Sequence, residues 1–329
     1  AQLKRFLIGF FLMIGIAMIP IWFWKSMSVL AYIASLGLLV LVDFFGSTGM
    51  GAQRWLDLGF IILQPSEMVK ITLIMVLAFY YDWLPDERVS KPQWIIAPLA
   101  LIFLPFLLVL QQPDLGTSLL IVIGGVVMMF LAGVHWGYFG AGLSFSVGGI
   151  LAILHSRGKD WQLLNDYQYR RIDTFLDPAS DPLGAGYHIT QSKIALGSGG
   201  WTGRGFGQGT QSRLNFLPEK HTDFIFTTLA EEFGFVGGIS LLTLYTLIVA
   251  FAIIAALRNK DRFSSLLIYG VTVTFFLYFA VNMAMVMGLA PVVGVPLPLV
   301  SYGGSSLLVL MAAFGLLQSA HVHKPRGVI

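Results

Sequence analysis

The chain has 329 residues, of which 56% are hydrophobic and only 11% are charged, and its formal net charge is +3. Globular chains usually carry about 25% charged residues, so this composition excludes an ordinary water-soluble protein and indicates an integral membrane protein. The basic residues are dispersed among loops without a stripe of interleaved aromatics, which argues against nucleic acid as a partner. There is no cysteine, so disulfides play no part.

Nine apolar runs are long enough to cross a bilayer, which takes roughly 17–25 residues of helix. The sequence therefore predicts an all-α polytopic membrane protein with nine transmembrane helices, forming one domain over residues 1–329. The seventh run is long for a single span, so we expect it to tilt or to extend beyond the membrane. In chain order, the predicted spans cover about 6–23, 28–45, 62–81, 94–111, 115–132, 136–154, 223–257, 264–289 and 303–320.

One large extramembrane loop, residues 155–222, lies between the sixth and seventh predicted spans. The positive-inside rule, applied to the short loops, puts the C-terminus in the cytoplasm and this loop outside. With nine spans, residue 1 would also lie outside and would have to be translocated without a signal. We therefore expect a parent with ten spans and both ends cytoplasmic, in which the first helix precedes this chain.

Three charged residues stand at the predicted outer ends of spans. Glu67 and Lys70 are three residues apart in the third span, so they share one helical face. They read either as a self-neutralising ion pair that tolerates burial or as the charged lining of a cavity. Asp114 begins the fifth span, where it either caps the helix or joins the same cavity.

The outer loop carries a glycine-rich stretch, residues 197–209, with basic residues around it. Lys193, Arg204 and Arg213 could cradle phosphates together with backbone N–H groups, although a flexible loop is the commoner explanation of such glycines. Arg170 and Arg171 add positive charge to the same loop. A cationic surface at the membrane boundary suits an anionic lipid headgroup better than a small neutral solute.

Four titratable residues lie within five positions where this loop enters the seventh span: Glu219, Lys220, His221 and Asp223. Charge at the edge of a bilayer is costly and normally marks a pathway or a reacting centre. Asp223 could act as a general base, or it could cap the helix that follows. His221 is the alternative base, because histidine titrates near neutral pH.

Six motifs in order carry a resemblance to a known family. They are GAQRWLDLG at 51–59, QPSE at 64–67, QPDLGT at 112–117, DPLGAGY at 181–187, LPEKHTDFIF at 217–226 and PLPLVSYGG at 296–304. In this order the motifs resemble the SEDS family (shape, elongation, division and sporulation proteins). GAQRW at 51–55 and GTQSRLNFLPE at 209–219 resemble its rod-shape branch, RodA, more than its division branch, FtsW.

The resemblance implies a peptidoglycan glycosyltransferase of the bacterial inner membrane that acts in cell-wall elongation and cell-shape maintenance. Such proteins polymerise lipid II at the outer face of that membrane, with a class B penicillin-binding protein as transpeptidase partner in the elongation machinery. The family's essential acidic residue corresponds to Asp223, and its intramembrane Glu and Lys correspond to Glu67 and Lys70. Asp114 matches the acid of the third motif. The leaving pyrophosphate would be stabilised by basic residues or by a divalent cation, Mg²⁺ or Mn²⁺.

Two other classes of function stay open from the residues. Buried charges in a many-helix protein also fit a transporter, here a lipid II flippase, although the polar residues cluster at outer helix ends rather than at the midplane. A scaffold that only recruits a penicillin-binding protein would use the same charges structurally. Asp223→Asn separates the enzyme from the scaffold, because only the enzyme should lose turnover.

Overall fold

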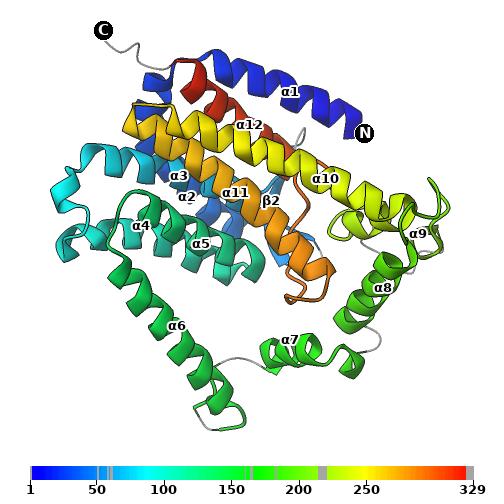
Figure 1. Ribbon diagram of the computed structural model, residues 1–329. Coiled ribbons are helices and arrows are strands. Elements are labelled where there is room, and N and C mark those ends of the chain that lie inside the picture. The colour runs from blue at the N-terminus through cyan, green and yellow to red at the C-terminus, as the bar shows by residue number, and fades with distance from the viewer. Residues whose placement is uncertain are drawn as a thin grey trace. The chain divides into compact units, whose positions relative to one another are not determined.

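The computed structural model describes residues 2–49, 52–57, 59, 62–159, 161–163, 166–181, 184–213 and 221–323. Over these residues the fold is mostly helical (Figure 1). The helices are α1 (Gln2–Met18), α2 (Ile21–Phe45), α3 (Pro65–Trp83), α4 (Pro92–Gln111), α5 (Leu115–Leu131), α6 (Trp136–Ser156), α7 (Asp166–Leu176), α8 (Ala185–Ser198), α9 (Thr210–Arg213), α10 (Ile225–Leu257), α11 (Arg262–Val286) and α12 (Gly304–Val322). Two short 3-10 helices are η1 (Asp86–Arg88) and η2 (Pro178–Ser180), and the strands are β1 (Ser47–Gly49), β2 (Ala52–Asp57) and β3 (Ile62–Leu63).

A helix lies at each of the nine predicted apolar runs. In the described part of the chain, six of these helices are long and apolar enough to cross a membrane by length and composition alone: α2, α4, α6, α10, α11 and α12. Of the other three, α1 and α5 have 17 residues each, and α3 carries Glu67, Lys70 and Asp82 within its 19 residues. The chain is thus a multi-pass membrane protein.

The segment between α2 and α3 differs from the all-helical prediction. It forms a small antiparallel sheet in the order β1-β2-β3, in which Ser47 pairs with Trp55 and Leu56 pairs with Leu63. Strands this short carry no periodic pattern that distinguishes them from a loop. Because of the sheet, α3 begins at Pro65 and not at the predicted residue 62. Proline fits the first turn of a helix because its missing N–H is not needed there.

The chain divides into two compact units. Unit 1 comprises Ala1–Gly133, Ser240–Ala280 and Val293–Ile329, and unit 2 comprises Val134–Ile239 and Val281–Val292. The predicted outer loop therefore falls into unit 2, where it contains the helices α7, α8 and α9.

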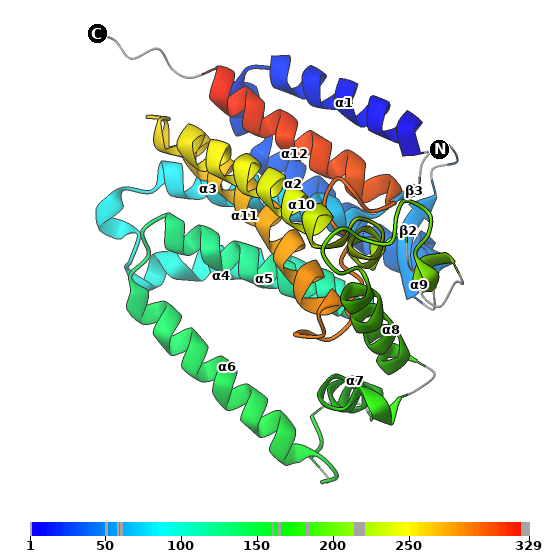
Figure 2. The same ribbon diagram turned by 45° about the vertical axis from the view of Figure 1, so that its right-hand side comes forward.

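Unit 1 is a bundle of apolar helices. Helices α1 and α12 lie side by side, as do α4 and α5, in both ribbon views (Figures 1 and 2). Aromatic rings join α10, α11 and α12: the centroid of Phe275 lies 5.1 Å from that of Tyr245 and 5.5 Å from that of Phe314. Rings at these separations in edge-on arrangements pack favourably.

One end of α3 is fixed by a network around Asp82. Its carboxylate lies 2.5 Å from Lys25 Nζ and accepts a hydrogen bond of 3.1 Å from the backbone N–H of Phe263. Nearby, Arg262 donates to the carbonyls of Leu84 and Ala132, which terminate α3 and α5. These contacts satisfy helix-end groups that would otherwise lack partners. They fix the end of α3 opposite to Glu67.

Unit 2 is held by contacts between α8, the start of α10 and the end of α11. Ser192 on α8 donates to the carbonyl of Val286 at 2.8 Å and lies 3.0 Å from the hydroxyl of Thr227. Beside them, Ala195, Phe224 and Val286 form a buried apolar cluster. The residue that follows Asp223 is thus part of the core of unit 2.

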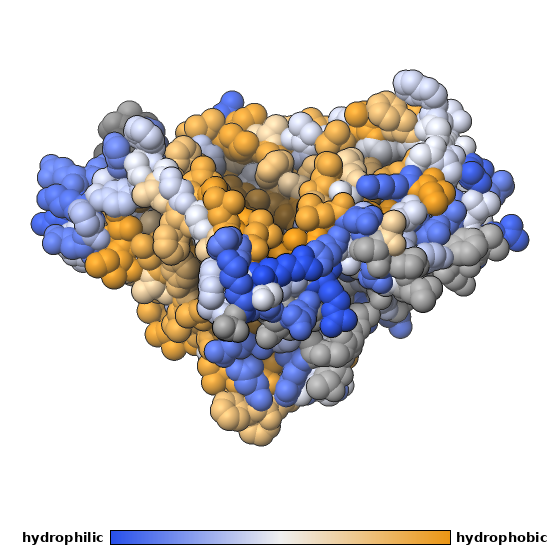
Figure 3. Space-filling view, turned by 90° about the horizontal axis from the view of Figure 1, so that it is seen from below, coloured by the Kyte–Doolittle hydropathy of each residue, from blue (hydrophilic) through white to orange (hydrophobic). Residues whose placement is uncertain are grey.

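Large apolar side chains also cover much of the surface. In the space-filling view of Figure 3, orange hydrophobic residues occupy broad areas of the visible face. Phe145 on α6 is 84% exposed and Phe251 on α10 is 70% exposed. Exposed patches of this kind are unstable in water but suit a lipid environment.

Candidate active site

A buried polar cluster joins α3 to α11 in unit 1. Lys70 Nζ lies 2.7 Å from Glu67 Oε1, and the hydroxyl of Tyr278 donates to Glu67 Oε2 at 2.5 Å. Lys70 also contacts the Tyr278 hydroxyl. All three residues are at most 7% exposed. The predicted ion pair is therefore present, and a phenol from a distant helix completes it.

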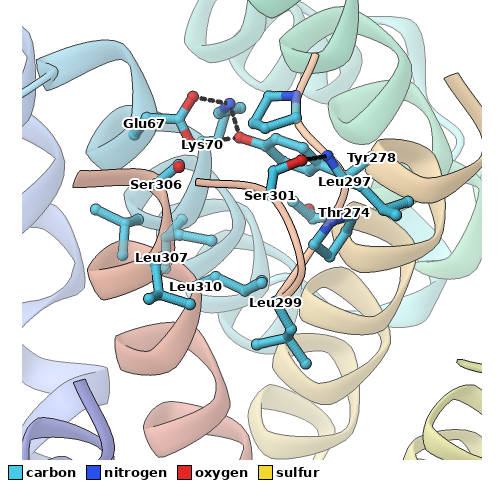
Figure 4. Close-up of a pocket in the computed structure, with 14 residues that line it drawn as sticks. Glu67, Lys70, Thr274, Tyr278, Leu297, Leu299, Ser301, Ser306, Leu307 and Leu310 are labelled. Carbon is cyan, nitrogen blue, oxygen red and sulfur yellow. Dashed lines mark hydrogen bonds and ion pairs between the residues drawn. The ribbon is translucent and has the colours of Figure 1, made fainter. Parts of the chain in front are cut away.

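The cluster borders a small cavity (Figure 4). Its volume is about 30 Å³, and its other walls come from residues 296–301 and from the start of α12. A cavity of this size holds about one water molecule. In this conformation the cluster has room for water beside it but no room for a sugar ring.

Asp114 caps α5. Its carboxylate accepts a hydrogen bond of 3.2 Å from the backbone N–H of Thr117, which is the capping role weighed for it. Gln64, the residue before α3, reaches Asp114 Oδ2 at 3.4 Å, and Arg54 of β2 lies 4.0 Å from the same oxygen. Arg54 also donates to the carbonyl of Gln112 at the end of α4. Asp114 is thus tied to the ends of neighbouring helices.

Asp223 lies in unit 2, two residues before α10 begins. The amide of Asn282 on α11 donates to its backbone carbonyl at 2.8 Å. Phe224, which follows it, is 1% exposed, and its carbonyl accepts the first hydrogen bond of the helix, from Thr227. The backbone of Asp223 is thus held on both sides, while the residue itself is only half-buried.

His188 of α8 lies near this segment, whereas Lys193 of the same helix lies against the turn after α11. The ring of His188 packs against Phe224 with centroids 6.2 Å apart, and its Nδ1 is buried without a hydrogen-bond partner in the described part of the chain. The side chain of Lys193 crosses Gly288, where an added Cβ would lie 2.8 Å from its Nζ. Gly288 has φ +72°, so the chain can turn under Lys193 only with glycine there.

The glycine-rich stretch is bonded to an interruption in α10. Gly234 has φ 65° and ψ −159°, so the helix is interrupted there. The carbonyls before Gly234 and the N–H groups after it therefore lack their usual partners within the helix. Arg204 and Gly205 donate to the carbonyls of Glu231 and Glu232, each at 3.0 Å. In return Phe235 donates to Gly200, and Val236 donates to Trp201. These N–H groups are therefore occupied within the protein, which favours a structural role for the loop backbone over a phosphate cradle.

The predicted basic residues of the loop have different surroundings. Arg204 donates to the carbonyl of Ser198 and to the hydroxyl of Thr210, and Thr210 donates to the buried carboxylate of Glu231. Arg213 and His221 are exposed. Glu219 and Lys220 lie outside the described residues.

The predicted site residues fall into both units. Glu67, Lys70 and Asp114 belong to unit 1, whereas Asp223, Lys193, Arg204, Arg213 and His221 belong to unit 2. The convergence of the two groups on one cavity stays a prediction.

Sequence reasoning missed Tyr278, Asn282 and Glu231. Each is polar within a long apolar helix, and a buried hydroxyl, amide or carboxylate needs a partner, so each could have been marked as a contact. Their partners, however, are 211, 59 and 21 residues away in the chain. Partners so far apart in the chain cannot be predicted from the spacing of residues within one helix.

The described residues contain no group of three or more His, Asp or Glu that could hold a metal ion.

The fold and these two groups of residues define a polytopic helical membrane protein with buried charge in one unit and a carboxylate at a helix start in the other. Comparison with known families is more specific. The profile of the family described as "Cell cycle protein", which takes its label from FtsW, RodA and SpoVE, matches residues 1–326, and the chain belongs to that family.

Relatives and solved structures agree with this membership. The chain is 46% identical over 325 residues to the peptidoglycan glycosyltransferase MrdB of Escherichia coli strain K12, covering 98% of this chain and 85% of MrdB. A structure of a peptidoglycan synthase complex that coordinates polymerization and crosslinking matches with a TM-score of 0.82 and 32% identity, covering 97% of this chain and 88% of that one. The crystal structure of the rod shape determining protein RodA of Thermus thermophilus matches with a TM-score of 0.70 and 28% identity. The match covers 97% of this chain and 86% of that one.

Proposed function

We propose that this chain is a peptidoglycan glycosyltransferase that polymerises lipid II into glycan strands. The substrate is a disaccharide-pentapeptide carried on undecaprenyl pyrophosphate, and the acceptor is a sugar hydroxyl of another such unit. Family membership and the similarity to MrdB support the reaction class. One structural observation carries the proposal: the backbone of Asp223 is fixed by Asn282 and by the buried Phe224, while Asp223 itself stays half-buried.

Asp223 acts as the general base. The acceptor hydroxyl is a poor nucleophile near neutral pH, so a carboxylate within hydrogen-bond reach takes its proton as attack proceeds. A bond forms between the acceptor oxygen and the anomeric carbon, and the bond from that carbon to the pyrophosphate oxygen breaks. Asp223 precedes the start of α10, and a helix N-terminus carries partial positive charge that attracts a carboxylate.

The leaving pyrophosphate gains negative charge and needs cations near it. Lys193, Arg213 and Lys220 are the proposed contacts, and Arg204 stabilises the loop that carries them. His221 and Glu219 complete the substrate-binding set. A divalent cation, Mg²⁺ or Mn²⁺, would reach this site bound to the pyrophosphate of the substrate. Glu67, Lys70 and Asp114 of unit 1 are also assigned to substrate binding, as buried polar groups near helix starts.

The protein works in the bacterial inner membrane as one functional domain of nine spans in this chain. Residues 155–222 face the periplasm or exterior, where the headgroup of lipid II is presented. A class B penicillin-binding protein of the elongation machinery cross-links the product. The similarity to a peptidoglycan synthase complex that couples polymerization with crosslinking supports a partner of this kind.

Purified protein in detergent tests the reaction. Wild-type protein mixed with lipid II should form glycan polymer, and Asp223→Asn should lose about 10²–10⁴-fold in rate, the usual contribution of a general base. Asp166→Asn is the matched control, because it removes an exposed carboxylate of the same unit and should polymerise normally. Full-speed polymerisation by Asp223→Asn would refute its role as the base.

Two alternatives give different results in the same preparation. A flippase, which the buried Glu67–Lys70 pair also suits, would move lipid II across vesicle membranes and form no polymer. A scaffold would bind its penicillin-binding protein partner and show neither activity. Polymer formed in detergent, with no membrane to cross, excludes both as the main function.

A further inference from the structure

Unit 2 contains a second cavity, of about 230 Å³, beside α7. Its polar lining is Arg170, Thr174 and Asp181, and its apolar lining includes Phe175, Ile189 and Val292. None of these residues is among those proposed to act on the reacting atoms. Most ligand pockets measure roughly 300–1,000 Å³, so this smaller cavity suits one part of a ligand, such as a phosphate group, rather than a whole lipid.

Helix α7 is fixed in orientation by one of its faces. Tyr169 donates to the carbonyl of Ile153 at 2.7 Å, and Asp173 accepts two hydrogen bonds from Arg157, at 2.6 and 2.7 Å. Tyr169 and Asp173 are four residues apart, so they share a face that packs on the end of α6. That anchor directs the neighbouring face of α7 to the cavity.

Arg170 and Thr174 occupy this neighbouring face, also four residues apart. Arg170 makes no hydrogen bond or ion pair with any residue that the structure describes. Asp181 is placed differently: its carboxylate lies against Gly184, where an added Cβ would be 2.4 Å from Oδ2, at the start of α8. A helix start favours negative charge, so Asp181 is already accommodated and the charge of Arg170 is left for a ligand.

We propose that this cavity binds the phosphate of a lipid, with Arg170 as the anion contact. A guanidinium forms paired hydrogen bonds with phosphate oxygens, and the hydroxyl of Thr174 adds a donor. Phe175, Ile189 and Val292 provide the apolar wall that a hydrocarbon chain needs. Val292 also packs against the Phe224 cluster, so the cavity shares a wall with the segment that carries Asp223.

The inference rests on the proposed function and assigns to it a subsite for the lipid phosphate of donor or product. The same chemistry would accept the phosphate of a bulk membrane phospholipid. The test therefore compares undecaprenyl pyrophosphate with phosphatidylglycerol as probes.

Binding is measured in detergent on the Asp223→Asn protein, so that the readout does not depend on turnover. Arg170→Gln should weaken binding of undecaprenyl pyrophosphate by about 10- to 100-fold, the usual effect of losing a hydrogen bond to a charged group. Thr174→Val should weaken it less, and Arg170→Lys should retain part of the affinity. Lys159→Gln, which removes an exposed charge from the same unit, should bind like the parent.

Unchanged affinity in Arg170→Gln, with an unchanged melting temperature, would overturn the proposal even if the wild-type protein polymerises lipid II. Equal loss of phosphatidylglycerol binding would support the lipid-phosphate site and assign it to the surrounding membrane. Selective loss of the pyrophosphate probe would assign it to the substrate. Polymerisation of lipid II by the wild-type protein is measured separately, and it tests the proposed function independently of this cavity.

Discussion

At the scale of single residues, burial explains why Glu67, Lys70 and Tyr278 depend on one another. A buried ion pair gains little overall, because the attraction between its charges must offset the cost of removing both from water. Removing one partner is much worse, since the other charge then stays buried and unpaired. The Tyr278 hydroxyl adds a donor to the carboxylate, which helps to complete the cluster.

A double-mutant cycle should reveal this dependence. Glu67→Gln or Lys70→Met alone should lower the free energy of unfolding by about 3–5 kcal/mol, because each leaves an uncompensated buried charge. The double variant should lose clearly less than the sum. Reversible unfolding in mixed micelles measures all four proteins, and strictly additive losses would contradict a coupled pair.

The Tyr278 hydroxyl can be tested separately. Tyr278→Phe should cost about 1–3 kcal/mol, because Glu67 Oε2 loses its buried donor while the ring still fills its place. Tyr302→Phe is the control, since Tyr302 is 41% exposed and should change stability little. A Tyr278→Phe protein as stable as its parent would show that water replaces the hydroxyl.

The sequence predicted the local part of this cluster and not the distant part. Glu67 and Lys70 are three residues apart on one helix, so helical geometry alone brings them together. Tyr278 arrives from α11 through tertiary packing, which no spacing along the chain records. For the same reason a capping role could be considered for Asp114 from the sequence, whereas its contacts with Gln64 and Arg54 could not.

At the scale of elements, the interruption of α10 explains the glycines before it. The backbone of Gly234 has a combination of φ and ψ that is essentially restricted to glycine. Its α-carbon also lies close to the loop, because an added Cβ would be 2.3 Å from the backbone nitrogen of Gly203. The sequence indicated a long seventh helix and a glycine-rich loop. It did not indicate that the loop forms hydrogen bonds with the backbone groups left without helical partners at the interruption of α10.

Gly234→Ala should therefore destabilise unit 2. The backbone strain alone costs about 1–3 kcal/mol, and the clash with the loop adds to it. Gly238→Ala in the same helix is the matched control, because its added Cβ would meet only Phe226 at 3.5 Å, an ordinary contact. Melting temperatures in detergent compare the two, and a Gly234→Ala protein as stable as the control would contradict the proposed restraint.

The anchor of α7 on α6 should depend on pH. The hydrogen bonds and charge of Arg157 lower the pKa of Asp173 below its usual value. A carboxylate with a lowered pKa in the folded state stabilises that state above the unfolded pKa of about 3.9, and the contribution is lost as pH falls through the lowered value. The anchor should thus be constant from pH 7 to 5 and weaken below about pH 4.

Amide hydrogen exchange of α7, corrected for the intrinsic pH effect, measures this dependence. The effect should be small because both side chains are at least 36% exposed. Asp173→Asn should show the faster exchange at pH 6 already, with no further change on acidification. If the parent protein loses protection between pH 7 and 5, a group other than Asp173 controls the anchor.

At the scale of the whole molecule, the apolar runs were the most predictable feature. Each of the nine predicted spans coincides with a helix, because a run of apolar residues in lipid must satisfy its backbone hydrogen bonds internally. The small sheet before α3 and the helices α7 and α9 of the outer loop were not predicted. Their residues are mixed in polarity and short in extent, so tertiary contacts rather than periodicity decide their structure.

The orientation of the spans in the membrane can be tested directly. The chain has no cysteine, so a single introduced cysteine reports its own side without background. Thr202→Cys in the loop and Lys260→Cys between α10 and α11 both replace exposed residues. Basic residues gather around Lys260, with Arg258 and Arg262 beside it, which favours the cytoplasm. A membrane-impermeant maleimide should therefore label Thr202→Cys in right-side-out vesicles and Lys260→Cys only in inverted ones. The opposite pattern would place Asp223 at the wrong face for a substrate presented outside.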